Sequence, residues 1–111
     1  MANHYYRDED LARFKEIGKN VPDLAAKFFE WYGAVFADGA LSAREKSTIA
    51  LAVAHAVQCP YCIDAYSRDA LEKGADLEQM TEAVHVAAAI KGGAALVHGV
   101  QMMNRVAELG M

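Results

Sequence analysis

Apolar residues recur at helical spacing from the first part of the chain onward. Leu11, Phe14 and Ile17 follow one another at intervals of three, the spacing of one face of a helix. Gly18 stands where such a helix would stop, and residues 20–23 have the composition of another helix start. The pattern therefore predicts a short first helix that ends near Gly18.

A second predicted helix carries most of the aromatic side chains. Its apolar face consists of four residues that lie three or four positions apart: Leu24, Phe28, Trp31 and Val35. Three further aromatic residues widen this face: Phe29, Tyr32 and Phe36. Asp38-Gly39 breaks the pattern. So much aromatic area favours burial against a partner subunit as well as the core, although aromatic stripes also belong to ordinary core helices.

A serine and a glutamate mark the start of a third helix. Residues 42–45, Ser-Ala-Arg-Glu, form a capping box, in which each of the two side chains satisfies a backbone N–H group of the other residue. We expect this helix to continue to about Val57. Pro60 fits the first turn of a following helix, because proline lacks the N–H that a helix start leaves unpaired. Cys59 is then the predicted N-cap, and Cys62 is the third helical residue.

Glycines and a second capping box divide the rest of the chain. Gly74 is a favourable residue for ending the fourth helix, and Asp76 with Gln79 predicts the start of a fifth. We expect Gly92-Gly93 to interrupt that helix, with a final helix running to Leu109. No segment shows the sustained alternation of a strand. The predicted fold is an all-α bundle of five to six helices, in one domain spanning residues 1–111.

Composition and charge exclude several classes of partner. The chain has 111 residues, 54% of them hydrophobic, and its formal net charge is -4 without a basic stripe that could neutralise phosphates. We therefore expect no nucleic-acid partner. The amino terminus has no apolar signal-peptide core, and no uninterrupted apolar run approaches the roughly 18 residues of a membrane span. These features predict a cytoplasmic protein without a membrane partner.

The only two cysteines form the motif Cys59-Pro60-Tyr61-Cys62. Thiols at this spacing close a disulfide without backbone strain, and a helix N-terminus stabilises the thiolate that attacks peroxides and disulfides. Two cysteines so close in sequence cannot join distant parts of a fold. The motif therefore predicts redox chemistry, with both sulfurs at a helix N-terminus.

Two further candidate catalytic residues flank the thiols at helical spacing. His55 precedes Cys59 by four positions, and Tyr66 follows Cys62 by four. His55 could accept a thiol proton, and Tyr66 could donate a hydrogen bond to a thiolate or hydroperoxide oxygen. Each residue can also be read as an ordinary packing residue of its helix.

Metal and cofactor sites have little support in the sequence. His55, Cys59 and Cys62 would supply three ligands, whereas a structural zinc site takes four. No flavin, haem or nucleotide motif is present, so we predict no metal and no cofactor. Reducing equivalents should then come from a partner dithiol, such as a thioredoxin or a lipoyl domain.

Three segments together resemble the carboxymuconolactone decarboxylase family, in particular its alkyl hydroperoxidase D-like branch. These are residues 42–62, which include the dithiol, residues 74–80 and residues 87–95. The resemblance implies an all-α fold assembled as homo-oligomers, either dimers, trimers or hexamers. It also implies a peroxidase or disulfide-reductase cycle. In that cycle Cys62 attacks the peroxide and becomes a sulfenic acid, Cys59 condenses with it to a disulfide, and an external thiol restores the dithiol.

Two positions depart from the pattern of that branch. It places a glutamate twelve residues before the first cysteine, where this chain has Ser47, and a histidine four residues after the second, where it has Tyr66. The proton relay of the branch is therefore not intact. Glu45 would face elsewhere on the helix, so His55 is the better substitute.

The sequence thus predicts a thiol-dependent peroxidase or disulfide oxidoreductase that reduces hydroperoxides through Cys59 and Cys62. Two alternatives stay open. One is an oligomeric binding protein whose cysteines sense redox state without efficient turnover. The other is a decarboxylase of a lactone acid, a reaction of other family members that needs no dithiol.

Overall fold

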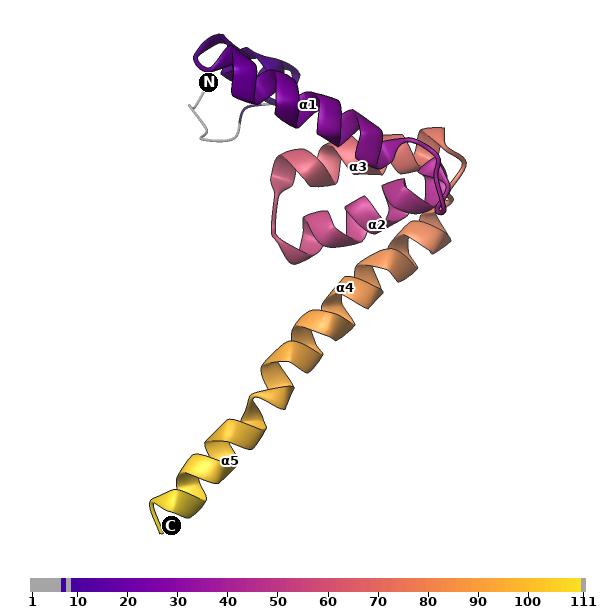
Figure 1. The fold of residues 1–111 in the computed structure, drawn as a ribbon. Coiled ribbons are helices and arrows are strands. Elements are labelled where there is room, and N and C mark those ends of the chain that lie inside the picture. The colour runs from indigo at the N-terminus through magenta and orange to yellow at the C-terminus, as the bar shows by residue number, and fades with distance from the viewer. Residues whose placement is uncertain (1–6, 8, 111) are drawn as a thin grey trace.

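A computed structural model of the chain describes Arg7 and residues 9–110, and within these residues every regular element is a helix (Figure 1). The order is a 3₁₀ helix followed by five α-helices: η1 (Leu11–Lys19), α1 (Pro22–Phe36), α2 (Ala43–Ala56), α3 (Pro60–Glu72), α4 (Leu77–Val97) and α5 (Gly99–Glu108). The predicted all-α class and number of helices are confirmed. The helices fall into three parts: the η1–α1 pair, the α2–α3 hairpin, and the rod formed by α4 and α5.

The predicted caps set the ends of the helices that hold the motif. Ser42 Oγ accepts the N–H of Glu45 at 3.0 Å, and the Glu45 carboxylate accepts the N–H of Ser42 at 2.8 Å. Asp76 and Gln79 form the same reciprocal pair at the start of α4. Gly74 follows α3 with a φ of 94°, a left-handed conformation in which glycine has no steric cost. All of these boundaries were predicted.

The core is small and lies between α2, α3 and the first half of α4. It is formed by Leu51, Ala70, Ala75 and Met80, and Tyr66 packs against it. Ala83 and Ala87 continue the buried face of α4, where their short side chains bring this helix close to α2. Further along α4, the Lys91 ammonium donates to the Ala56 carbonyl at the end of α2, at 3.1 Å. Beyond that contact, the rod formed by α4 and α5 extends away from the α2–α3 hairpin (Figure 1).

Aromatic contacts connect α1 to its neighbours. The ring centroid of Phe29 lies 5.1 Å from that of Phe14 on η1, and Phe36 stacks on Tyr66 of α3 with the same centroid distance and an angle of 20°. The predicted apolar face of α1 is the more exposed one, because Trp31 keeps 64% of its surface. The side that widens it, Phe29, Tyr32 and Phe36, is half-buried instead. One aromatic side of α1 therefore meets its neighbours in the chain, and the other stays exposed, so burial against a partner subunit stays a prediction.

The expected interruption at Gly92-Gly93 is wrong. Helix α4 continues through both glycines to Val97, and the division from α5 comes at His98, which caps both helices. Each glycine costs a helix about 1 kcal/mol relative to alanine, and a cost of that size does not end a helix between strong helix formers such as the flanking alanines. The result is the long rod of Figure 1.

The carboxyl-terminal half of the rod has no contact that buries it. From Ala88 to Gly110 every residue is exposed except Gly99, which is half-buried. Helix α5 is nevertheless strongly amphipathic. One half of its circumference, hereafter the α5 apolar face, continues into Leu109 and comprises Val100, Met102, Met103, Val106 and Leu109. The opposite half carries Gln101, Asn104, Arg105 and Glu108.

By length and composition, Leu77–Glu108 could cross a membrane, with a mean hydropathy of 1.4 over its most apolar part. The sequence expectation concerned an uninterrupted apolar run, whereas this helix qualifies by its length and mean hydropathy. A single helix of this kind is weak evidence for a membrane span, since helices that are covered by protein have the same composition.

The isolated chain exposes far more surface than its mass requires. Its accessible surface is 8729 Å², whereas a compact monomer of 12.1 kDa exposes about 6,000 Å². Its radius of gyration is 19.1 Å, against about 13 Å for a compact domain of this length. A single chain with so small a core gains little stability from the burial of apolar surface.

Candidate active site

The thiols lie at the turn that joins α2 to α3. Gln58 has a φ of 57°, the left-handed conformation that reverses the chain directly before Cys59. Cys59 is the N-cap of α3, and its Sγ accepts the N–H of Cys62 at 3.3 Å. The two Sγ atoms lie 2.6 Å apart, and both cysteines are free and half-buried. A disulfide of about 2.05 Å therefore needs only a small movement of the side chains.

Burial gives the two sulfurs different environments. Burial, followed by the contact with the Cys59 sulfur, raises the pKa of Cys62 to about 11. The helix N-terminus donates its N–H to the Cys59 sulfur, a contact that stabilises negative charge there. At Cys62, burial acts against the thiolate that a helix N-terminus was expected to favour.

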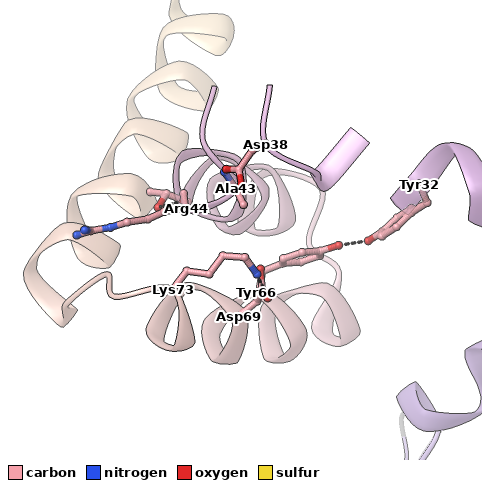
Figure 2. A network of polar contacts seen from close by, with 8 residues as sticks. Tyr32, Asp38, Ala43, Arg44, Tyr66, Asp69 and Lys73 are labelled. Atoms are coloured by element: carbon pink, nitrogen blue, oxygen red, sulfur yellow. Dashed lines mark hydrogen bonds and ion pairs between the residues drawn. The ribbon is translucent and has the colours of Figure 1, made fainter. Parts of the chain in front are cut away.

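Tyr66 is joined to a tyrosine that the sequence analysis did not select. Its hydroxyl is hydrogen-bonded to that of Tyr32 on α1, which reaches across from another part of the fold (Figure 2). Burial first, and then this hydrogen bond, raises the pKa of Tyr66 well above its ordinary value, so its phenol stays protonated. The charge of Cys62 acts in the same direction, because the thiol and the phenol are neighbours.

Two grooves meet at these side chains. The α1–α2 groove, about 440 Å³, is walled mainly by aliphatic side chains such as Ile49 and Val53. The η1–α3 groove, about 1190 Å³, lies between the 3₁₀ helix and the start of α3. Cys62, Tyr66 and Tyr32 line both grooves, whereas Cys59 lines only the η1–α3 groove. A small molecule can therefore reach Cys62 from two sides.

With this geometry established, sequence comparison places the chain among known proteins. Residues 22–105 match the model of the carboxymuconolactone decarboxylase family, and this range covers most of the chain. The chain belongs to the carboxymuconolactone decarboxylase family.

Two solved structures and one further sequence are similar to this chain. A carboxymuconolactone decarboxylase family protein of Legionella pneumophila, solved in its apo form, superposes with a TM-score of 0.68 at 30% identity, over 83% of this chain and 82% of that one. A protein of Methanobacterium thermoautotrophicum gives 0.73 at 33% identity, over 76% of this chain and 94% of that one. An uncharacterized protein of the cox locus of Paracoccus denitrificans is 53% identical over 64 residues, which are 58% of each chain.

The structure shows what surrounds the two positions at which this family member departs from the hydroperoxidase branch. Ser47 is fully buried, and its Oγ lies near the Asp69 carboxylate but forms no hydrogen bond of good geometry with the described residues. Asp69 is paired with Lys73 (Figure 2). Burial is the largest single effect and opposes ionisation of Asp69, but the hydrogen bond from Lys73, the contact with Ser47 and the charge of Lys73 together lower the pKa of the carboxyl.

An acid therefore lies close to Tyr66, although it comes from α3 rather than α2. The charge of Asp69 helps to keep the Tyr66 phenol protonated. Asp69 was not predicted as a site residue from the sequence, because charged residues are common on helices. Its spacing of three residues from Tyr66 and four from Lys73 is the sequence feature that could have indicated it.

His55 lies in a different environment from the thiols. Its Nδ1 contacts the Leu51 carbonyl oxygen at 2.8 Å, as expected for a histidine satisfied within its own helix. The ring lines a separate groove with residues of the turn and of the outer side of α3: Gln58, Pro60, Ile63, Asp64 and Ser67. Within this chain His55 does not share a groove with Cys62, so its role as proton acceptor stays a prediction.

Among residues 7 and 9–110 there is no group of three or more histidine, cysteine, aspartate or glutamate side chains placed to hold a metal ion. The chemistry that these described residues offer is that of two adjacent thiols and two joined phenols.

Proposed function

We propose that this chain is a thiol oxidoreductase that reduces organic hydroperoxides through a Cys59–Cys62 dithiol/disulfide cycle, as in the alkyl hydroperoxidase D-like branch. The observation that carries the proposal is the pair of sulfurs 2.6 Å apart, at the point where two grooves meet. The apolar lining of the α1–α2 groove suits the organic part of a hydroperoxide.

In the proposed cycle, the thiolate of Cys62 attacks the terminal oxygen of the hydroperoxide. A sulfur–oxygen bond forms, the oxygen–oxygen bond breaks, and the sulfur is oxidised to a sulfenic acid while the peroxide is reduced to an alcohol. The sulfur of Cys59 then attacks that of Cys62, water leaves, and a disulfide forms. Access from both grooves supports Cys62 as the attacking residue.

An external dithiol closes the cycle by donating two electrons to the disulfide. We propose a thioredoxin-like protein or a lipoyl domain for this step, because thiol–disulfide exchange needs only access to one sulfur. Cys59 faces the larger η1–α3 groove, which supports attack of the reductant at that sulfur. Peroxide turnover with thioredoxin, compared with turnover with dihydrolipoamide, distinguishes the two donors.

The pH dependence of peroxide oxidation tests the assignment of Cys62. Because the pKa of Cys62 is about 11, we expect the rate to rise about tenfold per pH unit from pH 7 to 10, since the attacking thiolate becomes tenfold more abundant with each unit. The measurement is stopped-flow oxidation of the reduced protein by cumene hydroperoxide. A rate that stays constant over this pH range would contradict the Cys62 thiol as the attacking residue.

The same experiment includes a comparison with a free thiol. Oxidation of the protein faster than that of free cysteine, at equal thiolate concentration, supports the peroxidase. Oxidation at or below the rate of free cysteine contradicts it, and then favours the second candidate, a redox-sensing protein without efficient turnover. The high pKa of Cys62 is the observation that keeps this candidate open.

We also propose that the protein functions as a homo-oligomer, in which the α5 apolar face packs on a second copy of this chain. The excess accessible surface of roughly 2,700 Å² exceeds the ~800 Å² that each partner buries in a stable complex. The charged residues of α5 are Arg105 and Glu108, so its polar half carries one basic residue rather than the several typical of helices that lie on membranes. A protein partner therefore fits this face better than a lipid surface.

A further inference from the structure

Tyr32 brings a phenol from α1 to the two grooves that Cys62 lines. It comes from α1, more than 20 residues before the dithiol in sequence, yet it lines both grooves together with Cys62. Its hydroxyl is bound to that of Tyr66, and its ring packs between Phe28 and Phe36, at centroid distances of 5.5 and 5.0 Å. The phenol is thus held in place by aromatic neighbours at the meeting point of the grooves.

We propose that Tyr32 is the catalytic acid that protonates the leaving alkoxide when Cys62 attacks a hydroperoxide. This inference rests on the proposed peroxidase function and adds a residue to it. Alkoxides are poor leaving groups, so a proton placed at the departing oxygen lowers the barrier to breaking the oxygen–oxygen bond.

The surroundings of the two phenols assign the roles within the pair. Tyr66 is the more deeply held, with the core behind it and the Asp69 carboxylate near its ring, and negative charge on its oxygen is unfavourable. Tyr66 therefore keeps its proton and donates it in the hydrogen bond to Tyr32. The Tyr32 hydroxyl is then left to donate into the groove, and Tyr66 stabilises the negative charge that develops on Tyr32 as its proton leaves.

The Cys62 thiolate forms a bond to the terminal oxygen, which keeps its hydrogen, and the sulfenic acid results. The other oxygen leaves with the electron pair of the broken bond and takes the proton of Tyr32, so the alcohol is released and Tyr32 becomes a phenolate. Water in the groove returns a proton to Tyr32 before the next turnover.

The test is the variant Tyr32→Phe with two oxidants that differ in their leaving group. Cumene hydroperoxide releases an alkoxide, which needs a proton, whereas peracetic acid releases acetate, which leaves unprotonated. For Tyr32→Phe we expect oxidation of Cys62 by cumene hydroperoxide to fall about 100-fold, the contribution of a general acid. Oxidation by peracetic acid should change by less than about threefold, because no acid is required there. Quenched flow with mass spectrometry of the sulfenic acid and disulfide measures both rates.

Tyr61→Phe is the matched control. It removes a phenol hydroxyl from the η1–α3 groove, but one that donates to Asp10 at 3.3 Å. We expect this variant to keep the wild-type ratio between the two oxidation rates, because its hydroxyl donates to Asp10. An equal loss with both oxidants in Tyr32→Phe would show a structural role and overturn the inference.

Failure of the inference and failure of the proposed function are distinguishable. A wild type that reacts rapidly with cumene hydroperoxide, matched by an equally rapid Tyr32→Phe, overturns the role of Tyr32 alone. A wild type that reacts with cumene hydroperoxide no faster than free cysteine overturns the peroxidase, and the role of Tyr32 with it.

Discussion

Cys62→Ser should lose hydroperoxide turnover almost completely. Cys62 is the sulfur that lines both grooves, and serine cannot form the sulfenic acid that begins the cycle. We expect peroxide consumption in the presence of an excess of dithiol to fall on the order of 10³-fold, as is usual when a nucleophile is removed. A coupled assay of peroxide loss measures this, with circular dichroism to confirm that the variant is folded.

Cys59→Ser is the matched control, because it makes the same change in the other sulfur of the pair. We expect this variant to react once with peroxide and to stop at the Cys62 sulfenic acid, which dimedone traps and mass spectrometry detects. Without Cys59 no second cysteine remains in the chain, so Cys62 cannot form a disulfide within it. The opposite pattern, with the trapped sulfenic acid on Cys59 in Cys62→Ser, would reverse the two roles. Consumption of a lactone acid by the double serine variant would instead indicate the decarboxylase.

The double variant Val100→Asp/Met103→Asp should dissociate the proposed homo-oligomer. Both residues lie on the α5 apolar face, where 51% and 66% of their surfaces are exposed in the isolated chain. Full burial of such a side chain in the interface stabilises association by about 1.5–3 kcal/mol. We therefore expect the loss of two such side chains to weaken association by at least about 100-fold. Because the core of one chain is small, we also expect a lower melting temperature. Sedimentation equilibrium and thermal circular dichroism measure the two effects.

The matched control adds the same charge to the polar half of the same helix. Gln101→Asp/Asn104→Asp introduces two carboxylates into α5 but leaves the apolar face intact. We expect it to assemble as the wild type does. A wild type that is monomeric at micromolar concentration contradicts the oligomer, and equal dissociation of both double variants contradicts the assignment of this face.

Local chemistry made the boundaries of the motif predictable. A capping box needs only a serine and a glutamate at the right spacing, so the start of α2 could be located without knowing what packs on it. The same holds for Pro60 after Cys59, which places one sulfur at a helix N-cap. Because Cys62 follows Cys59 by three residues, this placement brings the two sulfurs next to each other.

Contacts between helices were predicted less well. The apolar face of α1 was assigned from periodicity, but Tyr32 belongs to the side that meets α3. Both sides of α1 are rich in aromatic residues, so periodicity could not decide which one faces the domain. The predicted helix break at Gly92-Gly93 was wrong because helix propensity is summed over many residues. The neighbouring alanines outweigh the two glycines.

The sequence by itself determined the helical class, the caps and the placement of Cys59 and Cys62 on one turn, because each depends on residues within one helical turn of each other. The tertiary structure alone decided that burial raises the pKa of Cys62, that Tyr32 joins Tyr66, and that His55 lies in another groove. Burial and pairing depend on which faces of separate helices meet. That choice is made by the packing of the whole chain, and no spacing along a single helix encodes it.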